Sequence, residues 1–283
     1  MKKILIPVLF VMLALNGCSD DEGGGTGGTA GTGGTAGTGG TAGTGGAGGM
    51  GGTAGTGGTG GMGGAGGMGG DVVYEQDFNL LDINGTTIGD GWLFFVNVFS
   101  TPPNGYGGAA PNGTNNICGI VDDQGGPDQD PQQLSVFSDY NNNAAQTAGD
   151  LVETNVFQEL FSQGSEITAA EVGTTFTFRF QAKRGNINDP EDPNCAAPNV
   201  CDVTAQAFIK TLDPADGFAE SDSDTEDMTN LPDTWGGFTL SLDITAAQVG
   251  HILQLGFQTN ATNFEPSGNV YDNVLVTQSA TTP

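Results

Sequence analysis

The chain of 283 residues contains a single histidine and only six lysine and arginine residues. A Ser-His-Asp triad needs a histidine base. His251 opens the apolar segment 251–258, which has the composition of a β-strand, so we interpret it as a strand residue and not as a catalyst. The six basic residues face 33 acidic ones, which leaves a net charge of −27. Because such a surface repels phosphate backbones, nucleic acid is excluded as a partner.

The acidic excess has two interpretations: it keeps the protein soluble, or it binds divalent cations. Acids are densest between residues 213 and 227, at Asp213, Asp216, Asp222, Asp224, Glu226 and Asp227. They lack the glycine placement and the terminal glutamate of an EF-hand loop. We therefore expect a solvated acidic loop over residues 217–233.

The N-terminal apolar run, Ile4–Leu15, has about 12 residues, whereas a membrane helix needs roughly 20. It follows Lys2 and Lys3, an order typical of a secretory signal peptide. The sequence Leu-Asn-Gly-Cys at residues 15–18 resembles the lipobox of bacterial lipoproteins. That resemblance implies cleavage after residue 17 and lipidation of Cys18. The alternative is an ordinary signal peptide with an incidental cysteine.

Ser19 stands where an aspartate would retain many lipoproteins in the inner membrane. The same resemblance therefore implies a protein anchored in the outer membrane and exposed at the cell surface. From Gly23 to Gly70 the chain consists of glycine, threonine and alanine with a few methionines, and without proline a collagen-like triple helix is not favoured. Such a tract cannot form a core, so residues 18–70 are predicted to be a disordered, flexible tether.

Residues 71–283 have the patterns of an all-β domain. The segment 172–182 alternates between an apolar face, with Phe176, Phe178 and Phe180, and a polar face. We expect a two-sheet β-sandwich with strands near residues 71–78, 92–96, 134–137, 151–161, 172–182, 203–212, 235–244, 251–258 and 269–277. Ordered loops are expected elsewhere, above all over residues 100–150.

The final segment carries an acid in an apolar row. Val270, Asp272, Val274 and Val276 share one parity, so Asp272 is expected to face the core with three β-branched residues. An acid on a core-facing row needs a partner.

The order of motifs over residues 74–277 resembles that of jelly-roll carbohydrate-binding modules of the galactose-binding-like type, especially families 4 and 9. The matching pieces are Asp77-Phe78, Gly91-Trp92, Val156-Phe-Gln-Glu159, Gly173 with Phe176-Thr-Phe-Arg-Phe-Gln-Ala-Lys183, Thr234-Trp235 with Phe238-Thr-Leu-Ser-Leu242, and Tyr271-Asp272-Asn273-Val274. The resemblance implies a jelly roll that binds a poly- or oligosaccharide. The proline-rich and acidic loops are longer than in such modules.

Modules of this type often hold a structural calcium ion between the first strand and the Asp of the last. The resemblance implies such a site at Asp272, with Asp77 or Asn79, although Asn79 stands where the family often has glutamate. Hard cations take six to eight oxygen ligands, which Asp- and Asn-rich loops supply. The alternative is that Asp272 is a hydrogen-bonded structural residue.

Sugar recognition uses aromatic platforms flanked by amides and carboxylates. Trp92 and Trp235 match fold motifs of the similar modules, so we interpret both as structural. The remaining candidates are tyrosines in Asn- and Gly-rich loops and polar residues for the open face of a sheet. They are Tyr106, Tyr140, Asn141, Gln158, Arg179 and Gln181. The alternative is a polar sheet face without a ligand.

If Cys18 carries the lipid, three cysteines remain in an exported protein. Cys195 and Cys201 flank a short loop containing Pro198, and we predict a disulfide between them and a buried, free Cys118. Zinc is disfavoured because no histidine lies near and the spacing is not that of a zinc finger.

A carboxylate pair would suffice for a glycosidase, but the chain has no Glu-x-Asp-x-x-Glu run of the kind found in sandwich-fold glucanases. We therefore expect a surface-tethered, non-catalytic module that binds a poly- or oligosaccharide and contacts the membrane only through its lipid. A structural or adhesive lipoprotein without a sugar site is the second hypothesis. The sequence indicates no particular protein partner.

Overall fold

The computed structural model describes residues 70–83, 88–100, 103–109, 117–129, 131–138, 148–196, 198, 200–262 and 264–281. Every described residue belongs to one compact unit, Gly66–Pro283. The predicted signal peptide and Cys18 lie outside the described residues. Within the described ranges, no helix is both long and apolar enough to cross a membrane.

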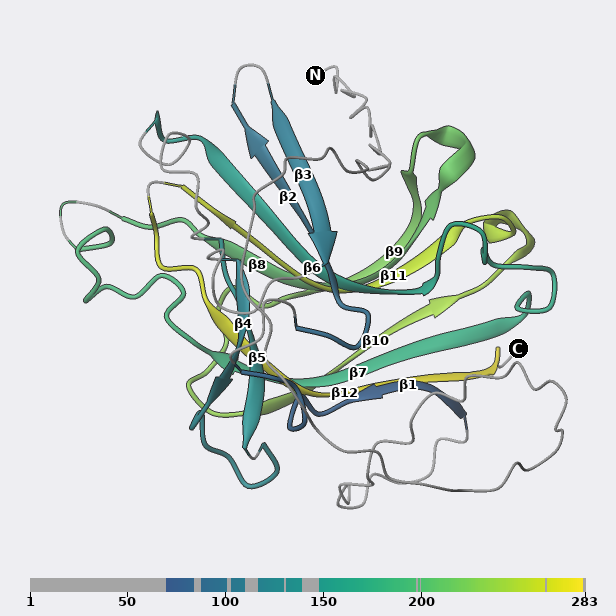
Figure 1. The fold of residues 1–283 in the computed structure, drawn as a ribbon, viewed down its shortest axis with the longest axis horizontal. Helices are drawn as coiled ribbons and strands as arrows, with labels where there is room; N and C mark the ends of the chain where they lie inside the picture. Colours follow the sequence, from purple (N-terminus) through teal and green to yellow (C-terminus); the bar gives the residue numbers. More distant parts are fainter. Residues whose placement is uncertain are drawn as a thin grey trace, which may run out of the picture. The chain divides into compact units, whose positions relative to one another are not determined.

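The described residues form two antiparallel sheets that pack face to face (Figure 1). The first sheet has the order β10 (Gly236–Asp243), β7 (Thr174–Arg184), β12 (Asn269–Ala280), β5 (Gln132–Val136), β4 (Cys118–Asp122), and β1 (Asp71–Gln76) also pairs with β12. The second has the order β3 (Asn104–Ala109), β2 (Leu93–Phe99), β6 (Leu151–Phe161), β11 (Ile252–Ala261), β8 (Thr204–Asp213), β9 (Ala219–Asp227). The 3-10 helices η1 (Pro214–Asp216) and η2 (Ala246–Gln248) lie in loops. The prediction of an all-β, two-sheet jelly-roll sandwich is confirmed.

The core lies between the sheets and is rich in aromatic side chains. The alternation expected for β7 holds, since Phe176, Phe178 and Phe180 are buried and the residues between them are half-exposed. Phe257 of β11 and Tyr271 of β12 stack across the two sheets with ring centres 3.7 Å apart. Burying one such side chain fully stabilises the fold by roughly 1.5–3 kcal/mol. These rings therefore hold the two sheets together.

Three strands lie in segments that we expected to be loops. Residues 100–150 contain β3 and β4 besides β5, and residues 217–233 contain β9. The glycine-rich composition of β3 is typical of a loop, but β3 is an edge strand that packs closely against β2. A Cβ at Gly107 would come within 2.7 Å of the Phe95 ring of β2. The prediction of loops in these segments is wrong, because β3, β4 and β9 form by pairing with neighbouring strands although their composition is typical of loops.

The acids of β9 are exposed but not part of a solvated loop. β9 pairs with β8 and forms one edge of the second sheet. Asp224 Oδ2 accepts a hydrogen bond from the backbone N–H of Ser241 at 2.8 Å, and Asp222 Oδ2 accepts one from Gln248 Nε2 at 3.2 Å. Ser241 belongs to β10, an edge strand of the first sheet. Asp224 therefore links the edges of the two sheets.

The closing strand β12 contains a β-bulge that changes which side chains face the core. Its register with β7 shifts between Asp272 and Leu275, and Asn273 has a φ of +50°. Asp272 pairs with Gln181 on the outer face of the first sheet, whereas Val274 belongs to the core. The prediction that Asp272 shares a row with the core valines is therefore wrong, although Asp272 is buried.

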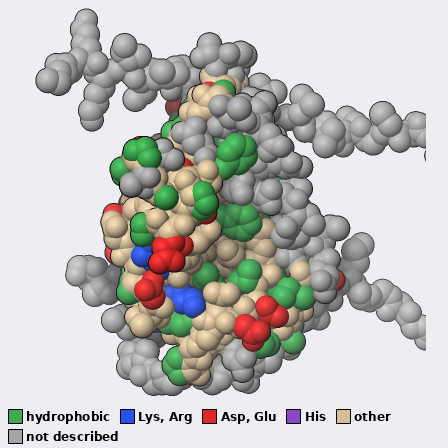
Figure 2. Space-filling model, turned by 90° about the vertical axis from the view of Figure 1, so that its left-hand side faces the viewer, with side chains coloured by type: hydrophobic (Ala, Val, Ile, Leu, Met, Phe, Trp, Pro, Cys, Tyr) green, Lys and Arg blue, Asp and Glu red, His purple; other side chains and the backbone are tan. Residues whose placement is uncertain are grey.

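The space-filling view of one side of the molecule shows hydrophobic, acidic and basic side chains interspersed on the described surface (Figure 2). Despite the large net negative charge, the acidic side chains therefore do not form one continuous patch on that side. Neutral ligands can approach such a mixed surface without an electrostatic penalty.

Candidate functional site

The outer face of the second sheet has a buried aromatic floor. Phe157 of β6, Gly256 of β11 and Phe208 of β8 pair in register across three strands. Their sequence neighbours Val156 and Ala207 belong to the core, which places the two phenylalanines on the opposite face. Since neighbouring strands lie about 4.8 Å apart, the two phenylalanines stand roughly 10 Å apart on either side of a residue without a side chain.

Polar side chains flank this floor on both sides. On one side Gln254 Nε2 donates a hydrogen bond to Glu159 Oε1 at 2.9 Å. On the other side Gln206 Nε2 donates to Gln258 Oε1. The register places each of these polar pairs in a row next to the aromatic row. An amide and a carboxylate therefore lie on one flank of an apolar strip, and two amides lie on the other.

Lys210 covers part of the floor. Its Nζ lies 4.4 Å from the centre of the Phe208 ring. Burial lowers the pKa of Lys210, and the carboxylates of Glu220 and Glu153 oppose that effect. Glu153 Oε1 also accepts a hydrogen bond from Asn155 Nδ2 at 3.0 Å. The polar groups of this face are thus already oriented by contacts with one another.

Two hairpins rise at the edges of this face. In Figure 1, β2–β3 and β8–β9 extend away from the first sheet on either side of β6 and β11. A cleft of about 290 Å³ lies at the β8 end and is lined in part by Gln206, Thr225, Asp227 and Asn260. We refer to the outer face of β6, β11 and β8, together with this cleft, as the trough.

Gln158, a predicted ligand residue, lies on the inner side of the second sheet. It pairs with the core residue Leu255. Its Nε2 donates hydrogen bonds to Tyr74 Oη at 3.0 Å and to the Asp90 carbonyl at 2.6 Å, and Tyr74 Oη donates to Asp90 Oδ2 at 2.8 Å. The Gln158 amide thus ties β6 to β1 and to the loop before β2.

Arg179 and Gln181 lie on the outer face of the first sheet. Their burial alternates with that of the core phenylalanines of β7. Gln181 Oε1 accepts hydrogen bonds from Gln129 Nε2 and, at 2.8 Å, from Asn273 Nδ2. The loop between β4 and β5 is therefore held against this part of the face.

The other predicted ligand residues add little to a common site. Tyr106 of β3 pairs with Val96 of β2, but its side chain is outside the described residues. Tyr140 and Asn141 also lie outside the described residues. The described candidates Gln158, Arg179 and Gln181 lie on two different sheets and are not brought together. Trp92 is buried, in agreement with its structural interpretation.

Sequence reasoning missed the outer face of the second sheet. The available signal was the recurrence of polar residues at alternate positions in two apolar strands: Gln254 and Gln258 in β11, and Gln206 and Lys210 in β8. Alternation reveals that such residues share a face. It does not reveal which strands lie side by side, and that information came from the sheet order.

Asp272 and Asp77 lie near each other where β1 meets β12. Burial raises the pKa of Asp272 to about 7, a hydrogen bond from the Asn273 N–H opposes the rise, and the charge of Asp77 adds to it. The Asn79 N–H donates to Asp77 Oδ1 at 3.1 Å, and Asn79 Oδ1 accepts from the Gln132 N–H at 3.0 Å. Two carboxylates and an ordered amide thus gather at this junction.

An unpaired oxygen lies beside them. Gln133 precedes Leu134, which pairs with Tyr271, so Gln133 is adjacent to Asp272. Its Oε1 is buried and accepts no hydrogen bond from the described residues. Hard cations bind such oxygens. In the described ranges no three His, Cys, Asp or Glu side chains are grouped as metal ligands, so a cation here would need amide and backbone oxygens as well.

The predicted disulfide is present. Cys195 and Cys201 are bonded, with their Cα atoms 5.1 Å apart, in the loop between β7 and β8. Cys118 of β4 is buried and takes no part in the bond. The predicted pairing is confirmed.

No family model matches the chain, and no curated protein matches it. Among solved structures, the chain is similar to the CBM22-1 xylan-binding domain of Paenibacillus barcinonensis Xyn10C, with a TM-score of 0.35 and 10% identity over 76% of this chain and 97% of that domain. It is also similar to an apo cyclase from Fischerella sp., with a TM-score of 0.43 and 13% identity over 73% of this chain and 94% of the cyclase.

A third similar structure is the enzymatically active domain of tailspike protein 4 from bacteriophage CBA120. The TM-score is 0.39 and the identity 12%, over 72% of this chain. The chain spans only 20% of that tailspike structure. At these levels of similarity we transfer neither a ligand nor an activity.

Proposed function

We propose that the protein is a non-catalytic module that binds a poly- or oligosaccharide on the outer face of its second sheet. The observation that carries this proposal is the arrangement of hydrogen-bonded polar pairs on both flanks of the floor formed by Phe157, Gly256 and Phe208. Side-chain amides donate and accept hydrogen bonds, as sugar hydroxyls do, and carboxylates accept them. Phe157 and Phe208 are buried, at 8% and 2% exposed, so the half-exposed side chains of Gln206, Gln258 and Glu159 are the groups that would contact a sugar.

The shape and charge of this face favour an extended, neutral chain. The face lies between the hairpins β2–β3 and β8–β9, and its cleft is at the β8 end. Its polar side chains are held by one another, so binding costs little side-chain entropy. The net charge of −27 disfavours acidic polysaccharides.

The test is retention of the full chain by immobilised neutral polysaccharides, with xylan, mixed-linkage β-glucan and mannan as the probes. Gln206→Ala combined with Gln258→Ala should weaken binding about tenfold, since each lost hydrogen bond contributes roughly 0.5–1.5 kcal/mol. Arg179→Ala, on the other sheet, is the control and should bind like the parent. Loss through Arg179→Ala alone would move the site to the first sheet. Retention by none of the probes would favour a structural or adhesive protein.

We also propose that a lipid on Cys18 anchors the module at the surface of the outer membrane. The sequence at residues 15–18 and the glycine-rich tether support this proposal. Several acyl chains suffice for stable anchoring. A flexible tether of this length has a root-mean-square span of roughly 35–40 Å, enough to hold a folded domain away from the membrane.

A structural calcium ion at Asp272, with Asp77 and Asn79, is the third part of the proposal. The raised pKa of Asp272 and the unpaired Oε1 of Gln133 support it. A cation at this junction would offset the repulsion between the two carboxylates and link β1 to β12.

A further inference from the structure

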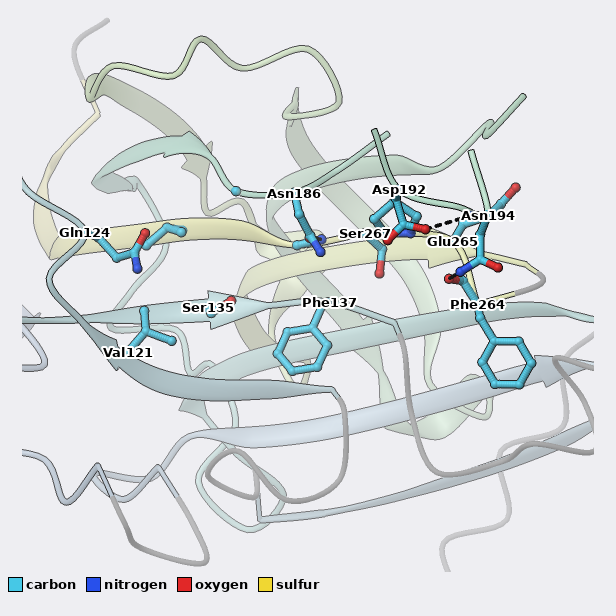
Figure 3. Close-up of a pocket in the computed structure, with 14 residues that line it drawn as sticks. Val121, Gln124, Ser135, Phe137, Asn186, Asp192, Asn194, Phe264, Glu265 and Ser267 are labelled. Atoms are coloured by element: carbon cyan, nitrogen blue, oxygen red, sulfur yellow. Dashed lines mark hydrogen bonds between the residues drawn. The ribbon is translucent and has the colours of Figure 1, made fainter. Parts of the chain in front are cut away.

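A second cleft lies on the outer side of the first sheet. Its volume is about 510 Å³ (Figure 3). Val121, Ser135 and Val270 form part of its floor, from β4, β5 and β12. Its walls come from the loop between β7 and β8 and from the loop between β11 and β12. The cleft is therefore on the opposite sheet from the trough described above.

The two walls of the cleft are fixed to each other. Cys195 follows the lining residue Asn194 directly, and its disulfide to Cys201 closes that loop. Asn194 Nδ2 donates a hydrogen bond to the Phe264 carbonyl of the other loop at 3.0 Å. In the second loop Glu265 Oε2 accepts a hydrogen bond from the Thr262 N–H at 2.7 Å. A cleft braced in this way is formed before a ligand arrives, which lowers the entropic cost of binding.

Phe264 is held in a strained backbone conformation at this cleft. Its φ is +61°, in the left-handed region that bulky side chains avoid. Such a conformation costs on the order of 1–3 kcal/mol and persists only where the surrounding structure holds it. Phe264 is half-buried, and in Figure 3 its ring and that of Phe137 point to the same side. This backbone conformation places the aromatic ring of Phe264 at the cleft.

The polar lining selects the chemistry of a ligand. Gln124, Asn186 and Asn194 contribute amides, Asp192 and Glu265 contribute carboxylates, and no lysine or arginine is among the described lining residues. Amides match hydroxyl groups, which also donate and accept hydrogen bonds. Without a cation in the lining, an anionic ligand is disfavoured. Aromatic rings beside amides and carboxylates suit a neutral sugar, whose hydroxyl groups can donate to the carboxylates.

We propose that this cleft is a second saccharide site, which binds a short stretch of a neutral glycan against Phe264 and Phe137. This inference rests on the proposed function, since it gives the same ligand class to a separate surface. Two sites on opposite sheets would let one molecule hold two segments of a polysaccharide. Linked binding of that kind can increase retention by 10²-fold or more without a new contact.

The experiment is calorimetric titration of the full chain with xylohexaose, cellohexaose and mannohexaose. Phe264→Asn removes the ring and suits a positive φ. Phe218→Asn is the matched control, because Phe218 also has a positive φ, +64°, but precedes β9 and lines neither cleft. Asn194→Ala is a second cleft variant that leaves the strained residue in place. Thermal melts confirm that each variant is folded.

The parent and Phe218→Asn should bind two oligosaccharides per chain, and both cleft variants should bind one. Two bound oligosaccharides in Phe264→Asn and Asn194→Ala would overturn the second site. The second site would also be overturned if the parent bound one oligosaccharide and the double variant Gln206→Ala with Gln258→Ala bound none. Either result leaves the proposed function intact. If the parent binds one oligosaccharide and only the cleft variants lose it, the cleft is the saccharide site and the trough is not. No binding of any hexaose by folded parent protein overturns both.

Discussion

Burial raises the pKa of Asp272 on the last strand, and the carboxylate of Asp77, which directly follows the first strand, raises it further. Burial is the larger cause, and the pKa reaches about 7. The fold thus holds a poorly solvated acid beside a second acid. A proton or a cation at this junction relieves the repulsion, and the two can be distinguished by experiment.

We expect calcium to raise the melting midpoint of the full chain, and Asp272→Asn to abolish the rise. A ligand that binds only the native state stabilises it by about 2.7 kcal/mol at a hundredfold excess over Kd. For a domain of this size that corresponds to roughly 5–10 °C. The measurement is calorimetry with chelator and with millimolar calcium. Asp224→Asn, in β9, is the control, and a rise lost only in that variant would place the cation on the acidic strand. Metal-free parent protein that does not respond would reject the site.

In chelator, the free energy of unfolding should fall as pH rises from about 4 to 7. The pKa of Asp272 is 3.8 in the unfolded chain and about 7 in the fold, so over this interval the native state holds a proton that the unfolded state has lost. Linkage then lowers stability with increasing pH, by up to about 1.4 kcal/mol per pH unit for one proton. Urea unfolding of the parent and of Asp272→Asn tests this. The variant should lack this component, and equal pH slopes in both proteins would contradict it.

Cys18→Ser should transfer the protein from the detergent phase to the aqueous phase in a phase-partition assay. It should also prevent labelling with radioactive palmitate in expressing cells, because the thiol is the proposed site of acylation. Ser19→Ala is the control and should behave like the parent. Continued membrane partitioning of Cys18→Ser would show that the lipoprotein hypothesis is wrong.

Replacing both Cys195 and Cys201 with serine should destabilise the domain by about 2 kcal/mol, the loop-closure entropy expected for a short ring. The melting midpoint should fall by roughly 4–8 °C. Mass spectrometry of a non-reduced digest of the parent should yield the Cys195–Cys201 peptide pair. A peptide that joins Cys118 to either residue would contradict the observed pairing.

Gly256→Ala should destabilise the second sheet by about 1–3 kcal/mol or more. A Cβ at this position would lie 2.2 Å from the Val156 carbonyl oxygen and 2.7 Å from the Cα of Phe157. Gly237→Ala, in the edge strand β10, is the control, because its Cβ would meet nothing within 4 Å. Urea unfolding measures both. Equally small effects would mean that the backbone at Gly256 yields without cost.

The segments that sequence predicted well are those in which side-chain alternation and burial agree. β7 is the clearest, because its three phenylalanines all face one core. β12 was assigned as a strand, but the parity of Asp272 was wrong because a bulge at Asn273 inserts a residue that no periodicity reveals. β9 escaped prediction because its acids suit an edge strand as well as a loop.

The candidate site was harder to predict than the fold. Gln158 and Gln254 are both glutamines in apolar strands, yet one lies inside the sandwich and the other on the outer trough. Only register and sheet order separate them, and those depend on pairing between segments far apart in the chain. The cleft at Phe264 depends on a backbone φ that composition does not encode.

Because Asp224 accepts the N–H of Ser241, one donor on the β10 edge is occupied by the molecule's own side chain. On the proposed membrane display, many copies would meet at high local density, and an unoccupied strand edge under such crowding can start the growth of fibrils. A carboxylate at this point both occupies the donor and repels the matching acid of a neighbour. The acidic strand is therefore expected to oppose self-assembly along the β10 edge.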